Sequence, residues 1–308
     1  MGDKKSLLIL KDGLQLISTN NEIKLKDITM QRKSFFIKFL FFTTLTFSYL
    51  SQAANKISDG EIYAYLELSG VKASIQSMPE QIQMMSQQMQ LTSANPEQDK
   101  VVIKALLSAW HEEKINEQLI TYIQDNMSSA EMTKILSWLN SNQVKKIKSA
   151  ELQATQTDFQ QELMRYMADL QSNPPTPERM KAVKDFVGTT KMTENATDIA
   201  IAIVENMFKG MKAAMPNKAM TDEQITQQLT QMRTMMSQVM HQQMMMVSYY
   251  LYRDITDAEL EEYMSFYKKP IGQTELTVVY AGLKKALSSW GDNIVTELSS
   301  ALKEKASE

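Results

Sequence analysis

Helical periodicity is the feature that most restricts the fold of this chain. From residue 54 onward, apolar residues recur at three- and four-residue spacing, and almost no stretch alternates apolar and polar residues as a strand would. Helix starts are marked by capping boxes, in which a hydroxyl residue is followed three positions later by an acidic one. These pairs are Ser58 with Glu61, Ser128 with Glu131, and Thr256 with Glu259. The sequence therefore predicts an all-α fold.

The helical region also contains an internal similarity. Residues 129–139 align without a gap with residues 257–267, and apolar positions match apolar ones. A proline-rich stretch, residues 171–177, separates the two copies and has the composition of a semi-rigid linker. We therefore predict two tandem degenerate repeats of a roughly four-helix unit, residues 54–171 and 177–308, with an additional C-terminal helix. Each repeat is long enough for a core of its own.

The expected helices follow from the capping signals and the periodicity. In the first repeat they are residues 59–69, 73–91, 97–126 and 129–169. In the second they are residues 177–187, 193–214, 221–252 and 257–268, and a last helix at 274–304 after Pro270.

Residues 30–53 have the pattern of a secretory signal peptide. Basic residues at the start precede an uncharged apolar run, residues 39–50, and small residues lie at positions 51 and 53. We predict cleavage between Ala53 and Ala54 and a periplasmic or secreted protein. The apolar run is shorter than the ~20 residues that a membrane span needs. We therefore expect no stable membrane span after cleavage.

Residues 1–29 precede this signal and have no obvious role in it. They are mixed polar, whereas a signal peptide usually starts close to the first methionine. Either the signal has a long leading region, or translation starts at Met30 and residues 1–29 are a mis-called N-terminus. We favour the second alternative.

The end of the second repeat carries the chain's most distinctive motif. Residues 257–273 read Asp-Ala-Glu-Leu-Glu-Glu-Tyr-Met-Ser-Phe-Tyr-Lys-Lys-Pro-Ile-Gly-Gln. This run resembles the hallmark of domain-of-unknown-function family 2059, exported bacterial helical proteins with Glu-Leu, Phe-Tyr and Pro-x-Gly-Gln elements after a long helix. The first repeat departs from it, with Trp138-Leu139 at the aromatic pair. The resemblance implies an envelope location and an all-helical fold, and no established activity.

The same motif has a physical interpretation. Pro270 ends a helix, and Gly272 permits a turn with positive φ. Tyr263, Phe266 and Tyr267 share one helix face. An aromatic face of this kind either fastens a helix corner to its neighbours, which is the more common case, or lines a binding surface.

Methionine is unusually frequent, with 24 residues, and is concentrated around residues 78–89 and 232–246. Three interpretations compete. Core packing is favoured by two seams at alternating four- and three-residue steps. These seams are Ile75, Met78, Ile82, Met85 and Met89, and Ile225, Leu229, Met232, Met236, Val239 and Met246.

The other two interpretations use residues away from the seams. Met235 and Met240 widen the apolar stripe and could form an adaptable binding surface together with the aromatic face. Alternatively, His241, Met244 and Met245 lie at positions i, i+3 and i+4, a ligand set that favours Cu(I).

Composition excludes several classes of function. The chain has no cysteine, two histidines and no glycine-rich phosphate loop or nucleophile elbow, so we predict that it is not an enzyme. Residues 1–53 hold eight of the basic and four of the acidic residues, so the remainder is more acidic than the total charge of −3 indicates. Nucleic acid is therefore not an expected partner.

The sequence as a whole predicts a periplasmic, non-catalytic binding or envelope-maintenance protein without a cofactor. Its Met- and Tyr-lined helical groove would bind an apolar peptide or an envelope protein. The alternative is a periplasmic Cu(I)-binding protein.

Overall fold

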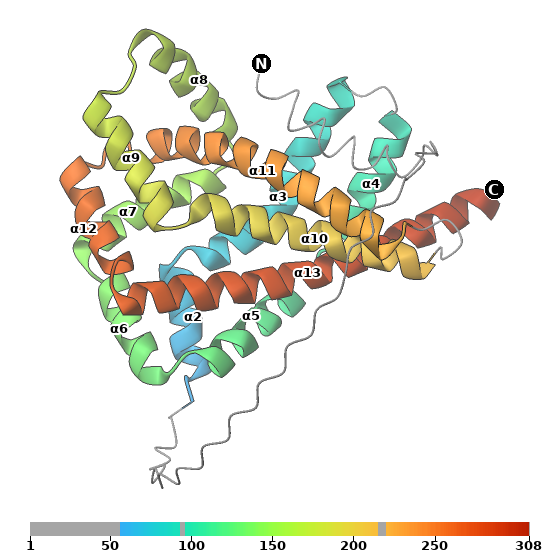
Figure 1. Ribbon diagram of the computed structural model, residues 1–308, viewed down its shortest axis with the longest axis horizontal. Coiled ribbons are helices and arrows are strands. Elements are labelled where there is room, and N and C mark those ends of the chain that lie inside the picture. The colour runs from blue at the N-terminus through green and yellow to red at the C-terminus, as the bar shows by residue number, and fades with distance from the viewer. Residues whose placement is uncertain (1–55, 93–95, 215–219, 308) are drawn as a thin grey trace, which may run out of the picture. The chain divides into compact units, whose positions relative to one another are not determined.

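The computed structural model describes residues 56–92, 96–214 and 220–307, and all the regular structure in these ranges is helical (Figure 1). The predicted all-α fold is confirmed. The predicted signal peptide, residues 30–53, and the stretch 1–29 lie outside the described residues.

Seven α-helices and one 3-10 helix make up the described part of the first predicted repeat. They are α2 (Asp59–Leu68), α3 (Val71–Thr92), α4 (Pro96–Ser108), α5 (Glu112–Asn126), α6 (Ser129–Leu139), α7 (Asn142–Glu151), the 3-10 helix η1 (Leu152–Thr155) and α8 (Phe159–Ser172). The described part of the second repeat contains α9 (Pro177–Thr189), α10 (Met192–Ala214), α11 (Asp222–Leu251), α12 (Asp257–Tyr267) and α13 (Pro270–Ser307).

The three predicted capping boxes are present. In each, the hydroxyl accepts the backbone N–H three residues later and the acidic side chain bonds back to the capping residue. The Ser128 hydroxyl and backbone N–H, which bond Glu131, hold the pKa of that carboxyl below its usual value. These caps explain why the starts of α2, α6 and α12 could be located from the sequence.

Two predicted long helices are wrong because each is interrupted. The predicted helix 97–126 is α4 and α5, separated where Trp110 turns into the core and contacts Trp290 edge-on, with ring centroids 5.2 Å apart. The predicted helix 129–169 is α6, α7, η1 and α8. Its first break lies at Ser141, whose hydroxyl accepts the Val144 N–H and begins α7.

The last helix, α13, begins earlier than predicted, at Pro270. Proline suits the first helical position because the N–H that it lacks would have no partner there. The α6–α7 and α12–α13 boundaries fall at equivalent places of the aligned segments 129–139 and 257–267. The duplication itself stays a prediction.

The core is shared between the two predicted repeats. α13 lies between α10 and α5 (Figure 1), and its contacts extend to α4, α6 and α12. α2 packs on α6, and α9 packs on α12. One cluster of buried apolar side chains runs from Ile57 to Leu287, so both predicted repeats contribute to it, and a smaller cluster lies between α10 and α11.

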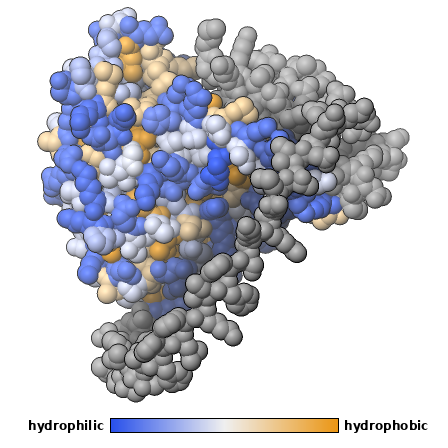
Figure 2. Space-filling model, viewed as in Figure 1, coloured by the Kyte–Doolittle hydropathy of each residue, from blue (hydrophilic) through white to orange (hydrophobic). Residues whose placement is uncertain are grey.

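The molecular surface is mostly polar. Figure 2 shows hydrophilic residues spread over the viewed face with scattered hydrophobic ones between them. Among the described residues, the exposed large apolar side chains are Tyr63, Met164, Met180, Met235 and Met246. In the described part of the chain, every helix is too short or too polar to cross a membrane.

Two helix corners share one backbone conformation. Gly70, between α2 and α3, has a φ of 80°, and Lys191, between α9 and α10, has a φ of 52°. Each N–H donates to the carbonyl three residues before it, Glu67 or Gly188, over 3.2 Å. The second corner therefore places a side chain where glycine is favoured.

We expect Lys191→Gly to raise the free energy of unfolding by about 0.5–1 kcal/mol, because glycine removes the left-handed strain. Thermal unfolding followed by circular dichroism measures this change. The control is Lys184→Gly at an exposed position inside α9. This variant should have a free energy of unfolding about 1 kcal/mol lower than that of the wild type. A loss of stability in Lys191→Gly would contradict the assignment of strain.

Candidate functional site

The predicted aromatic binding surface is not open to a ligand. Tyr263, Phe266 and Tyr267 are 2%, 6% and 5% exposed, so their assignment to a surface groove is wrong. Trp138 of α6 stacks on Phe266, with centroids 3.8 Å apart and planes 6° apart, and it also contacts both tyrosine rings. The aromatic face is buried because α12 packs on α7, α9 and α13.

The predicted positive φ at Gly272 is also wrong. Gly272 lies in the first turn of α13, and only Gly70 and Lys191 have positive φ among the described residues. A glycine is needed at position 272 for a different reason. A Cβ at this position would lie 2.3 Å from the Phe266 carbonyl oxygen, so the backbone of the α12–α13 corner leaves no room for a side chain.

The methionine seams pack largely as predicted. Ile225 and Met232 are buried against Ile201 and Phe208 of α10, with Leu229 and Met236 packed beside them. In the first repeat, Ile75 and Ile82 are buried and Met78 packs on the core. The side chains of Met85 and Met89 lie outside the described ones. Met246 is 38% exposed, so its place in the seam is wrong.

The methionines predicted for a binding surface and the residues predicted for copper are distributed along α11. Met235 is 50% exposed and Met240 is half-buried, whereas the aromatic face is buried, so these residues do not form one open surface. Met244 and Met245 pack against the core. His241 is exposed, and its Nδ1 lies 3.4 Å from the Thr193 hydroxyl. Copper binding stays a prediction.

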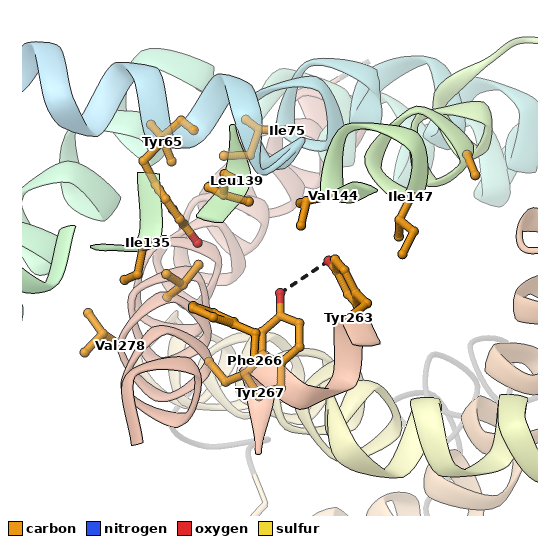
Figure 3. Packing of buried hydrophobic residues seen from close by; sticks show 14 of the residues in the cluster. Tyr65, Ile75, Ile135, Leu139, Val144, Ile147, Tyr263, Phe266, Tyr267 and Val278 are labelled. Atoms are coloured by element: carbon orange, nitrogen blue, oxygen red, sulfur yellow. Dashed lines mark hydrogen bonds between the residues drawn. The ribbon is translucent and has the colours of Figure 1, made fainter. Parts of the chain in front are cut away.

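The centre of the molecule contains a group of buried and half-buried polar side chains from several helices, which we call the buried polar cluster. Figure 3 shows the Tyr263 and Tyr267 hydroxyls pointing at each other, 3.4 Å apart, with the Tyr65 hydroxyl directed into the same region. Tyr65 donates to Oε1 of Glu275 over 3.0 Å. The remaining members are Lys148, Glu151, Tyr252 and Tyr280.

Further contacts in this cluster join helices that are distant in sequence. Lys148 of α7 pairs with Glu151 over 2.7 Å, and Tyr252, immediately after α11, donates to the Glu151 carboxylate over 3.0 Å. Oε2 of Glu275 is buried and has no hydrogen-bond partner among the residues that the structure describes. A buried carboxylate with one unsatisfied oxygen is costly to ionise.

The cluster strongly affects the ionisation of its members. Burial raises the pKa of Glu275 to about 7, while the Lys148 charge and the Tyr65 hydrogen bond oppose the rise. Burial also raises the pKa of Tyr252, Tyr263 and other tyrosines well above the usual value, so these hydroxyls stay neutral. Burial disfavours the charge of Lys148, but the Glu151 carboxylate outweighs it and raises the pKa of that ammonium.

Sequence reasoning missed Glu275, although a signal was present. Glu275 precedes Val278 and Val279 by three and four positions, and both valines are buried. A carboxylate in line with an apolar helical stripe is either buried or at the edge of a core. The cluster can hold a proton near neutral pH. Its buried members, Tyr65, Tyr252, Tyr263, Tyr267 and Glu275, are packed inside the fold and are not placed to contact a substrate.

An open pocket lies elsewhere, between α8, the linker, α9 and the α11–α12 connection, with a volume of about 470 Å³. We call it the tyrosine pocket. Its principal lining residues are Tyr166, Arg179, Tyr249, Arg253, Asp169 and Asp257. Apart from Asp257, which begins the motif 257–273, none of these residues was predicted from the sequence, because the pocket forms only when the linker brings α8 beside α11.

Both arginines of the tyrosine pocket are held in place. Arg179 pairs with Asp257 over 2.5 Å and also donates to the Tyr252 carbonyl. Arg253 donates to the Tyr250 carbonyl over 2.7 Å, and its guanidinium lies 4.2 Å from the centre of the Tyr250 ring. The pocket thus presents rigid charged groups beside the half-buried Tyr249.

Searches against protein-family models, curated proteins and solved structures found no match to this chain. The resemblance of residues 257–273 to family 2059 therefore stays a prediction.

Proposed function

We propose that this protein is an exported, non-catalytic binding protein that takes a peptide segment of a partner in the tyrosine pocket. The pocket carries the proposal, because it combines two half-buried tyrosine rings with two fixed arginines in one open concavity. Tyrosine and arginine supply much of the binding energy at protein interfaces. Tyrosine also offers a large contact area with few rotatable bonds to order.

Other features support parts of the proposal. Pro175 lines the pocket, and the adjacent prolines of the linker give that wall a restricted backbone. The signal-like pattern of residues 30–53 supports export, with Ala54 as the first residue of the mature protein. The absence of cysteine from the sequence and its two histidines support a binding role over catalysis.

The test is a fluorescence-polarisation titration of short random-sequence peptides with protein isolated from the periplasm and checked by N-terminal sequencing. We expect saturable binding that weakens about tenfold in Tyr249→Ala, because this variant removes one of the two rings. Tyr63→Ala is the matched control, since Tyr63 is 57% exposed on α2 and lies outside the pocket. Equal affinities of the Tyr249→Ala variant and the wild type would contradict the assignment.

A further inference from the structure

A second pocket lies in the groove between the N-terminal part of α10 and residues 276–284 of α13. Its volume is about 250 Å³. α10 and α13 run side by side here (Figure 1). Lys191, just before α10, and Asn195 line it on one side, and Thr277 and Lys284 line it from α13. We call it the lysine pocket.

The charges of the lysine pocket are unbalanced. Lys191 and Lys284 are not buried, and neither forms an ion pair with any residue that the structure describes. The carboxylate in the lining is Asp198, and it is paired with Arg233 of α11. The first turn of α10 adds the partial positive charge of a helix N-terminus, which Glu194 in the same turn partly offsets. Two ammonium groups that line one pocket are therefore without an ion-pair partner in the described part of the protein.

The interior of the lysine pocket is partly apolar. Ile199, Leu276 and Ala281 line it together with Tyr280. Burial raises the pKa of Tyr280 to about 12, so this wall stays neutral and does not repel an anion. The pocket combines positive charge at its rim with an apolar wall.

The position of Lys191 is independent evidence that its side chain matters. Lys191 has a φ of 52°, whereas glycine occupies the corresponding corner at Gly70. A lysine at this conformation is retained at a cost in stability. Backbone strain of this kind is concentrated at functional sites.

We propose that the lysine pocket binds a small organic carboxylate, with Lys191 and Lys284 holding the carboxylate group and the α10–α13 wall contacting its short apolar chain. This site is separate from the tyrosine pocket. The two ammonium groups give charge-assisted hydrogen bonds to the anion. The volume limits the apolar part to a few carbons.

The test is ligand-observed NMR titration of the protein with hexanoate, and with hexan-1-ol and inorganic phosphate as probes. We expect hexanoate to bind with a Kd on the order of 1 mM or below, and more weakly at high salt. Lys191→Gln and Lys284→Gln should each weaken binding by about tenfold. The matched control is Lys285→Gln, since Lys285 adjoins Lys284 but lies near the Tyr122 ring, outside the pocket.

Two more variants distinguish loss of this site from loss of the fold and from loss of the tyrosine pocket. Lys191→Gly should bind hexanoate more weakly while the protein becomes more stable, which excludes unfolding as the cause. Tyr249→Ala should bind hexanoate as the wild type does, so failure of the peptide proposal leaves this one standing. Unchanged binding in Lys284→Gln, or equal binding of hexan-1-ol, would overturn the charged site. Binding of phosphate without hexanoate would overturn the carboxylate assignment.

Discussion

Gly272→Ala is expected to lower the free energy of unfolding by about 3 kcal/mol, which is a fall of roughly 6–12 °C in melting temperature. The added Cβ would lie 2.3 Å from the Phe266 carbonyl oxygen and 2.6 Å from the Tyr267 Cα. Both are backbone atoms, so no side-chain rotation relieves the contact. Hydrogen bonds also fix this corner, because Gln273 donates to the Tyr267 carbonyl and the Lys269 N–H donates to that of Phe266.

Differential scanning calorimetry of Gly272→Ala beside Gly188→Ala isolates this steric cause. Gly188 lies inside α9 with nothing within 4 Å of the position that a Cβ would take. Alanine at this position should raise the free energy of unfolding by about 0.5–1 kcal/mol, because its helix propensity is higher than that of glycine. If both variants shifted the melting temperature in the same direction, close backbone approach would not be the reason for Gly272.

The second large effect concerns Glu275, whose replacement by glutamine should stabilise the protein at pH 8 by about 3 kcal/mol. Burial raises the pKa of this carboxyl from 4.5 to about 7. In the folded state it therefore keeps a proton that the unfolded chain has already released. Glutamine is neutral at every pH, and its carbonyl oxygen can still accept the bond from Tyr65 that Glu275 Oε1 accepts now.

The pH dependence follows from the direction of this shift. Below pH 4.5 the carboxyl is protonated in both states, and the wild type and Glu275→Gln should differ little. Between pH 4.5 and about 7 the unfolded chain ionises first, so the wild type loses stability as pH rises. Above about pH 7, the free energies of unfolding of Glu275→Gln and the wild type should differ by the full amount.

Urea unfolding of both proteins from pH 4 to 8 measures this difference directly. The control is Glu262→Gln, an exposed carboxyl on α12, which should show no comparable trend. A difference between wild type and Glu275→Gln that does not change with pH would show that Glu275 is not the proton-linked group.

Local signals account for most of the helices that could be predicted. The capping hydroxyls at Ser58, Ser128 and Thr256 and the spacing of apolar residues act within one or two turns, so they can be recognised in the sequence. The missed break at Ser141 carried the same kind of signal, a capping serine without an acidic partner three residues later. The helical spacing of apolar residues continues past Ser141, so the boundary between α6 and α7 could not be recognised from the periodicity.

The parts that could not be predicted depend on contacts between distant segments. Trp138 meets Phe266 through packing that no local pattern specifies. The same contact buries the aromatic face that was a candidate surface. The motif indicates that a glycine is required at position 272. The cause of that requirement, the close approach of the Phe266 backbone, depends on the three-dimensional structure. Both pockets likewise lie between helices whose relative positions the sequence does not give.

The position of α13 has a consequence for the order of folding. Its contacts are with α4, α5, α6, α10 and α12, all of which precede it in the chain. During translation, these helices therefore leave the ribosome before α13 does. Contacts between residues so far apart form slowly, since a long loop must close before they stabilise the chain. Until residues 270–307 are available, the apolar faces that α13 covers remain in water, and the incomplete protein is at its most prone to aggregate.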